Sequence, residues 1–155
     1  MKKETLKRIF EFLEDKEGQN PPFMWKHMND KSIAEEELNV KGDLNLWGRD
    51  IKSLPEGLKV EGFLNLEFST IQTLPKGLEV GENLALSGCQ QLTLLPERLK
   101  VGGTLYVQYS EISSLPKGLE VNGALFISNT ELEKYTDEEL REMIKPGFIK
   151  GNIYR

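Results

Sequence analysis

The sequence predicts an α/β solenoid, a single structural domain in which short repeated units stack along one axis. One phrase recurs five times at a spacing of 20 or 21 residues, and apolar and polar residues alternate at its centre as in a half-buried strand. One such unit cannot bury its apolar side alone, whereas stacked units can. We therefore expect residues 40–132 to form five repeats, with a short parallel sheet on the concave face and helical caps at both ends.

Residues 1–39 lack the repeat and are expected to form the N-terminal helical cap. Apolar residues within 6–13 recur at i, i+3, i+4 and i+7, which gives a helix one apolar face. The prolines at 21–22 end this helix, and a capping-box pattern at 32–35 predicts the start of a second short helix. The alternative for the first helix is a segment that binds a partner or a membrane.

Each repeat begins with a valine and continues with leucines at four and six residues further on, then a Leu-Pro step. The Leu-x-Leu centre predicts a strand whose leucines point inward, and the glycine before it is expected to take a turn conformation. The half that contains Leu-Pro-x-Gly-Leu predicts turn, extended or 3₁₀ structure. The five copies start at Val40, Val60, Val80, Val101 and Val121.

Two further positions of the repeat alternate in charge from copy to copy, so that stacked neighbours have opposite signs. A slip by one coil would place like charges together, so this pattern favours a role in register. The two rows are Glu56, Lys76, Glu97, Lys117 and Lys59, Glu79, Lys100, Glu120.

Residues 133–155 are expected to close the stack as a C-terminal cap. A capping box at 136–139 predicts the start of a helix, and Pro146 with Gly147 stops it. Four apolar or aromatic residues follow that we expect to cover the last coil: Phe148, Ile149, Ile153 and Tyr154.

The repeats resemble the leucine-rich repeat family, whose core reads Leu-x-x-Leu-x-Leu-x-x-Asn/Cys-x-Leu, and residues 64–71 match this core in frame. The short period and the Leu-Pro step are most similar to repeats of bacterial secreted effectors and of small phage and bacterial proteins. The resemblance implies a small bacterial or phage protein that binds a host protein and modulates or inhibits it, as an effector or an anti-defence protein. The resemblance does not distinguish between these two roles, because proteins of this architecture bind many different partners.

The family's Asn, which bonds the backbone within each coil, is replaced in every copy of this chain. Hydroxyl groups can supply part of that bonding, and Cys is the family's own alternative, so Cys89 is interpreted as structural rather than reactive. The five residues at this position are Arg49, Ser69, Cys89, Ser110 and Thr130.

The composition of the chain argues against several classes of partner and location. The net charge of −5 argues against a nucleic-acid partner, and a single cysteine excludes an internal disulfide framework. No apolar stretch reaches the ~18 residues of a membrane span and no signal-peptide pattern begins the chain, so we expect a protein that is cytoplasmic where it is made. Delivery into a host cell stays open.

No cofactor, metal site or catalytic site is expected from the residue types. The only histidine is His27, and no Gly-rich phosphate loop is present. Asp43 and Glu67 are the only acids on the expected concave face, in adjacent coils, which is a poor match to a pair of catalytic carboxylates. The sequence therefore predicts a protein that is not an enzyme.

The expected concave face has no Arg, Lys or His and combines aromatic side chains with amides, a mixture that protein interfaces favour. We expect a non-enzymatic protein-binding module. A carbohydrate-binding surface that uses Trp47, Tyr106 and Phe126 is the main alternative, and a self-assembling homo-oligomer is another. Some aromatics also have a simpler interpretation as cover for their neighbours in the sheet. The candidate binding residues are Asp43, Asn45, Trp47, Phe63, Asn65, Glu67, Phe68, Tyr106, Gln108, Tyr109 and Phe126.

Overall fold

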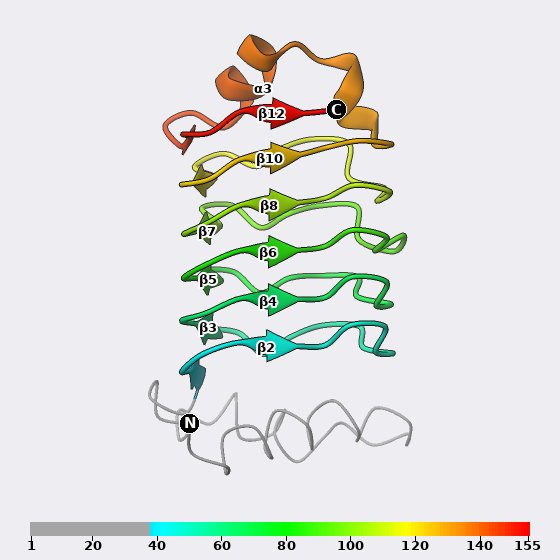
Figure 1. Cartoon of the computed structure of the whole chain (residues 1–155), viewed down its shortest axis with the longest axis vertical. Helices are drawn as coiled ribbons and strands as arrows, with labels where there is room; N and C mark the ends of the chain where they lie inside the picture. The colour runs from blue at the N-terminus through cyan, green and yellow to red at the C-terminus, as the bar shows by residue number, and fades with distance from the viewer. Residues whose placement is uncertain (1–37) are drawn as a thin grey trace.

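The computed structural model describes residues 38–155, which form a parallel β-solenoid (Figure 1). Two parallel sheets, each of six two-residue strands, run the length of the stack. The helices expected within residues 1–39 lie almost entirely outside the described residues. The described part of the chain contains no helix that is both long enough and apolar enough to cross a membrane.

The first sheet contains the Leu-x-Leu segments and confirms their expected parallel pairing. Equivalent leucines are in register from coil to coil, as Leu44 with Leu64 and Leu64 with Leu84. Backbone hydrogen bonds continue past the strand ends, for example from Leu46 N to Asn65 O at 2.7 Å. The strands are β2 (Leu44–Asn45), β4 (Leu64–Asn65), β6 (Leu84–Ala85), β8 (Leu105–Tyr106), β10 (Leu125–Phe126) and β12 (Ile153–Tyr154).

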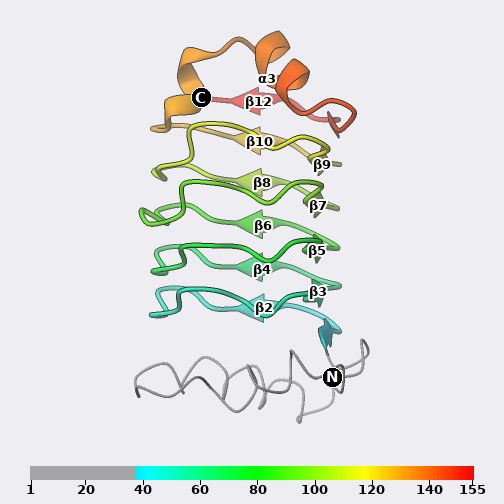
Figure 2. The same ribbon diagram turned by 180° about the vertical axis from the view of Figure 1, so that it is seen from behind.

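A second sheet, which the sequence analysis did not predict, forms where each repeat begins (Figure 2). In each of its first five strands the second residue is a buried valine, and in the middle four the first is a charged residue. A strand of two residues is too short to show alternation in a sequence. The strands are β1 (Asn39–Val40), β3 (Lys59–Val60), β5 (Glu79–Val80), β7 (Lys100–Val101), β9 (Glu120–Val121) and β11 (Phe148–Ile149).

The core runs unbroken along the interior of the stack. The valine, the two leucines of the strand, the isoleucine and the leucines of the Leu-Pro half all enter one buried cluster. Leu64, Leu66 and Ile71 of the second repeat, for example, are each 0% exposed. The Leu-Pro half contains turns and an isolated bridge between Ser53 and Thr73, in agreement with the expected turn or extended structure.

Four glycines precede strands of the first sheet, and three of them lack the expected turn conformation, namely Gly62, Gly103 and Gly123. Of the glycines at this position only Gly42 has a positive φ, 106°. At Gly62 an added Cβ would lie 2.7 Å from the carbonyl carbon of Gly42, and at Gly123 it would lie 2.7 Å from that of Gly103. Gly62 and Gly123 are therefore required because neighbouring coils approach closely there, whereas Gly42 has the expected turn conformation.

The predicted helix after the repeats is present as α3 (Asp137–Met143), preceded by a 3₁₀ helix, η3 (Glu131–Lys134). Its capping box is confirmed: Glu139 N donates to Thr136 Oγ1 at 3.2 Å, and Thr136 N donates to Glu139 Oε2 at 2.8 Å. Leu140 and Ile144 enter the core. The helix thus packs onto the C-terminal end of the solenoid (Figure 1).

The residues after α3 do more than cover the last coil. Strand β11 pairs with β9 and strand β12 pairs with β10, so the C-terminal segment adds one strand to each sheet. Arg141 of α3 donates to the carbonyl oxygens of Ile149 and Gly151, which fastens the helix to this last coil.

Candidate binding surface

We define the front face as the outward side of the sheet β2–β4–β6–β8–β10–β12. Alternate side chains of a strand point to opposite sides, so residues between the buried leucines point outward. All the candidate residues lie on this face or in the turns directly after its strands. Five are exposed, namely Asp43, Asn45, Trp47, Phe68 and Tyr109, and six are half-buried, namely Phe63, Asn65, Glu67, Tyr106, Gln108 and Phe126.

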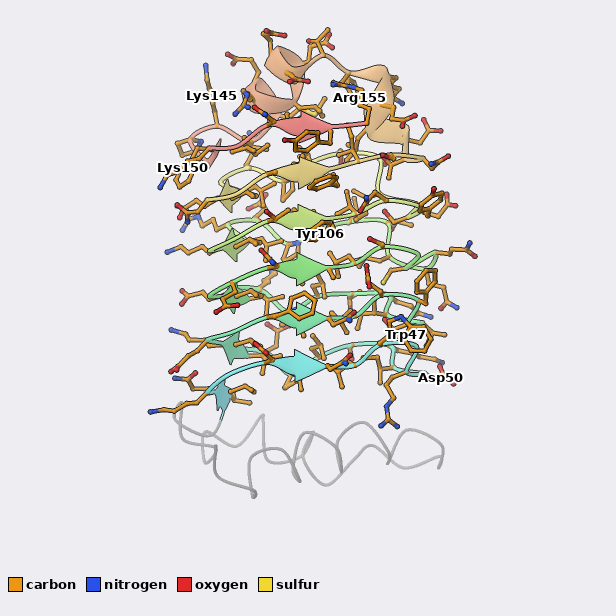
Figure 3. The ribbon with its side chains drawn as sticks, viewed as in Figure 1. Trp47, Asp50, Tyr106, Lys145, Lys150 and Arg155 are labelled. Atoms are coloured by element: carbon orange, nitrogen blue, oxygen red, sulfur yellow. The ribbon has the colours of Figure 1, made fainter. Side chains whose placement is uncertain are left out.

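Three rings form an aromatic stack on the front face over the C-terminal coils. The ring centroids of Tyr106 and Phe126 are 5.0 Å apart at an interplanar angle of 17°, and those of Phe126 and Tyr154 are 4.6 Å apart at 21°. Tyr106 is the second residue of β8 and is labelled in Figure 3. Sequence reasoning did not include Tyr154 among the binding residues.

A sequence signal for Tyr154 was nevertheless present. The segment Gly151-Asn152-Ile153-Tyr154 repeats the order of Gly123-Ala124-Leu125-Phe126, with glycine, a spacer, an aliphatic residue and an aromatic residue. The register of the structure pairs Phe126 with Tyr154 directly. The last ring of the aromatic stack therefore follows the residue order of the repeats, although 28 residues separate Phe126 from Tyr154.

Two of the polar candidate residues accept hydrogen bonds from the backbone of their own turns. Asn45 Oδ1 accepts a hydrogen bond from Trp47 N at 3.1 Å, and Asn65 Oδ1 accepts one from Glu67 N at 3.0 Å. Such turns between a side chain and the backbone two residues on shape the chain where the strand ends.

Hydrogen bonds between coils engage two more polar candidates. The carboxylate of Asp43 accepts a hydrogen bond from Phe63 N, 2.8 Å away in the next coil. Gln108 Oε1 accepts one from Ser87 Oγ at 3.1 Å. Ser87 and Ala85, both buried although they face outward, separate the aromatic stack from the aromatics of the first coils.

We define the turn edge as the row of turns after the front strands, residues 47–50, 67–70, 87–91, 108–111 and 128–131. Trp47, Phe68 and Tyr109 are 58%, 60% and 59% exposed there, and the rings of Trp47 and Phe68 meet edge to face at 6.1 Å. Trp47 and Asp50 lie along this edge, while Lys145 and Lys150 lie at the opposite edge (Figure 3).

One position of the turn edge has a left-handed backbone in every coil. The φ angles are 64° at Gly48, 57° at Phe68, 72° at Gly88, 56° at Tyr109 and 57° at Asn129. Ladder hydrogen bonds align these residues from coil to coil. Glycine and asparagine adopt this conformation readily, whereas it is an outlier for bulky residues. Phe and Tyr at this position therefore hold strained backbone.

The charges of the repeats are separated by face. On the outward strand positions of the repeats only Asp43 and Glu67 are charged. The turn edge contains four carboxylates and one guanidinium, a formal charge of −3, at Arg49, Asp50, Glu67, Glu111 and Glu131.

The alternating charges of the second sheet stand in the predicted register. Lys59 lies opposite Glu79, Glu79 opposite Lys100, and Lys100 opposite Glu120. Lys59 Nζ and Glu79 Oε2 are 3.4 Å apart. Cations on this side therefore alternate with carboxylates, in contrast to the front face and the turn edge.

The two front-face acids are set apart along the strand direction. Asp43 lies beside Phe63, because its carboxylate accepts the hydrogen bond from Phe63 N. Glu67 follows Phe63 by four residues in the same coil, which at the rise of a strand places it about 13 Å from Phe63. Carboxylate pairs that hydrolyse glycosidic bonds lie about 5–9.5 Å apart. Among residues 38–155, no group of three or more His, Cys, Asp or Glu side chains could hold a metal ion.

Three of the five residues at the position of Arg49, Ser69, Cys89, Ser110 and Thr130 donate side-chain hydrogen bonds to the backbone. Ser110 Oγ donates to Val107 O and Thr130 Oγ1 donates to Ile127 O, both at 2.6 Å. Cys89 is fully buried, its thiol donates to Leu66 O at 3.0 Å, and burial raises the pKa of this thiol. The geometry of Cys89 therefore suits a structural role, because a thiol of raised pKa is protonated at neutral pH.

No protein-family model, curated protein or solved structure matches this chain.

Proposed function

We propose that this chain is a non-enzymatic protein-binding module whose front face receives another protein. The observation that carries the proposal is the aromatic stack of Tyr106, Phe126 and Tyr154, which is only partly buried on a face whose strands present no lysine, arginine or histidine. Rigid aromatic groups with amide neighbours are the residues that concentrate binding energy in protein interfaces.

The ring geometry favours a protein over a carbohydrate as the ligand of the aromatic stack. A sugar ring binds against the open face of an aromatic ring. Both faces of Phe126 are occupied, by Tyr106 on one side and Tyr154 on the other. Phe126 therefore presents only ring edges to a ligand, which suits apolar and polar side chains of a protein better than a flat sugar.

The size of the surface supports an interface that includes more than the strands. Six strands at ~4.8 Å spacing span about 24 Å, whereas a standard interface takes ~800 Å² from each partner. The turn edge adjoins the front face and adds Trp47, Phe68 and Tyr109 to it.

We also infer that the solenoid is a leucine-rich repeat of the short bacterial or phage type, with helical caps at both ends. The in-frame repeat, the parallel strands of the leucines and the packing of α3 against the last coil support this inference. On the resemblance of the repeats, the proposed role is that of an effector or anti-defence protein that modulates or inhibits a host protein.

The experiment compares partner capture by three tagged baits in lysate of the source cell, quantified by mass spectrometry. The baits are the wild type, the stack variant Tyr106→Ala/Phe126→Ala, and a control on the opposite side, Lys76→Glu/Glu97→Lys. A partner held by the wild type and the control but lost by the stack variant supports the proposal. Each aromatic truncation should cost about 1–4 kcal/mol of binding free energy, measured by calorimetry with the captured partner.

Two outcomes contradict this assignment. Equal capture by the stack variant, with thermal melts that show all baits folded, removes the front face from the function. Glycan-array binding without any captured protein favours the carbohydrate alternative instead.

A further inference from the structure

The strained aromatics of the turn edge are not required by the fold. The same left-handed position is occupied by Gly48 in the first coil, Gly88 in the third and Asn129 in the fifth, so stacking proceeds without a bulky side chain there. Phe68 and Tyr109 instead combine a strained backbone with side chains that are 60% and 59% exposed. A strained backbone that holds an exposed ring indicates that the ring has a function other than stabilising the fold.

Their contacts explain little of this placement. The Phe68 ring lies over Gly88, where an added Cβ would be 2.5 Å from Phe68 Cδ1, and its edge meets Trp47. Among residues 38–155, Tyr109 makes no aromatic pair and its hydroxyl makes no hydrogen bond. The Phe68 ring therefore fills the space that a side chain at Gly88 would occupy, and it covers the backbone of the third coil.

The net negative charge of the turn edge favours a positively charged ligand. Asp50, Glu67 and Glu111 flank the aromatic residues, and Arg49 is the only basic residue of the five turns. Asp50 Oδ1 accepts a hydrogen bond from Thr70 Oγ1 at 2.5 Å, which holds this carboxylate against the second coil. Aromatic faces beside carboxylates attract cations, and arginine most of all, because guanidinium groups both stack on rings and pair with carboxylates.

We propose that the turn edge binds a basic segment of a partner protein, with arginine side chains stacked on Phe68 and Tyr109 and paired with the neighbouring carboxylates. This inference rests on the proposed function in taking the partner to be a protein. It adds a second contact surface beside the front face and names the chemistry that this surface recognises.

The spacing of the backbone positions of Phe68 and Tyr109 defines the form of the segment. Phe68 and Tyr109 are two coils apart, about 9.6 Å at the spacing of parallel strands. In a polyproline II segment, side chains three residues apart point the same way and are about 9.3 Å apart. An extended segment with arginine at every third position therefore matches the two-coil spacing of these residues.

The test is an NMR titration of the isotopically labelled full chain with short synthetic peptides. The probe has arginine at every third position and proline between. A matched peptide has glutamate in place of arginine, and cellohexaose serves as a neutral carbohydrate. The variant Phe68→Gly/Tyr109→Asn removes both rings, keeps every charge and installs residues that other coils already use at this position.

We expect the arginine peptide to shift the amide signals of Gly48, Phe68, Gly88 and Tyr109, and the glutamate peptide to leave them unchanged. The dissociation constant should rise about tenfold in Phe68→Gly/Tyr109→Asn. The midpoint of thermal unfolding of this variant should stay equal or rise, because the left-handed backbone strain is removed. Loss of binding without loss of stability separates a binding role from a structural one.

Three results overturn the inference: no shift of these signals by the arginine peptide at millimolar concentration, equal affinity of the two-ring variant, or binding of cellohexaose in place of the peptide. The stack variant Tyr106→Ala/Phe126→Ala should bind the arginine peptide as the wild type does. A failure of the front-face proposal therefore leaves this test intact, and a failure of this test leaves the front-face proposal intact.

Discussion

Truncation of Leu86 to alanine in the central coil should be strongly destabilising. Leu86 is 0% exposed, and hydrogen bonds hold the backbone on both sides of it, with Leu86 N donating to Tyr106 O at 2.8 Å and Leu66 N to Ala85 O at 2.9 Å. The substitution removes three carbons, about 2.4 kcal/mol of transfer free energy at ~0.8 kcal/mol per methylene. The bonded coils cannot collapse to fill the space, so a cavity term raises the expected loss to about 3–5 kcal/mol.

Urea unfolding followed by circular dichroism measures this loss. At an m-value of about 1–3 kcal/mol/M, the midpoint should fall by roughly 1–5 M relative to the wild type. The matched control is Leu94→Ala, the same chemical change at a leucine that is 63% exposed, which should cost less than ~0.5 kcal/mol. Equal losses in the two variants, or a loss below ~0.5 kcal/mol for Leu86→Ala, would refute the inward placement of the strand leucines.

Three further predictions test the coil spacing, the C-terminal helix and the buried thiol. Gly81→Ala places a Cβ 2.0 Å from Glu61 O, so it should cost more than Gly77→Ala, where φ is 70° and no atom lies within 4 Å, and the order of the two thermal melts decides. Thr136→Ala should cost about 0.5–2 kcal/mol through the lost cap, and unchanged urea unfolding would show that this cap does not stabilise the chain. Because burial raises the pKa of Cys89, the contribution of its thiol to stability is present below the unfolded thiol pKa of ~8.5 and is lost as pH rises through the folded pKa. Wild-type stability should therefore decline more steeply than that of Cys89→Ala above pH ~8.5, and parallel pH profiles would contradict this.

The coil repeat and the strand leucines were predictable because a solenoid translates equal positions onto each other. A residue that recurs every 20 or 21 positions meets its own copy in the next coil, as Leu44 meets Leu64. The capping box at Thr136 was predictable for a different reason, since its two hydrogen bonds join residues only three apart. Periodic and local signals alone were sufficient for these features.

The second sheet was not predicted because its strands are too short to show a pattern in the sequence. The last coil was not predicted because its residues do not follow the repeat at the regular spacing. Each strand of the second sheet has two residues. Ile149, Gly151 and Ile153 repeat the spacing of Val121, Gly123 and Leu125, but η3 and α3 intervene and break the period. Tyr154 entered the aromatic stack only through this pairing.

For the candidate surface, the sequence by itself determined which side chains point outward and that they carry no basic group, since alternation along a strand requires no knowledge of neighbours. Only the tertiary structure decided how those residues divide. In the structure, one stack contains Tyr106, Phe126 and Tyr154. The side chains of Asn45 and Asn65 accept hydrogen bonds within the turns. The backbone is left-handed at Phe68 and Tyr109. The physical reason is that ring stacking and backbone φ depend on the coil above and the coil below, and residue types along one coil do not specify either.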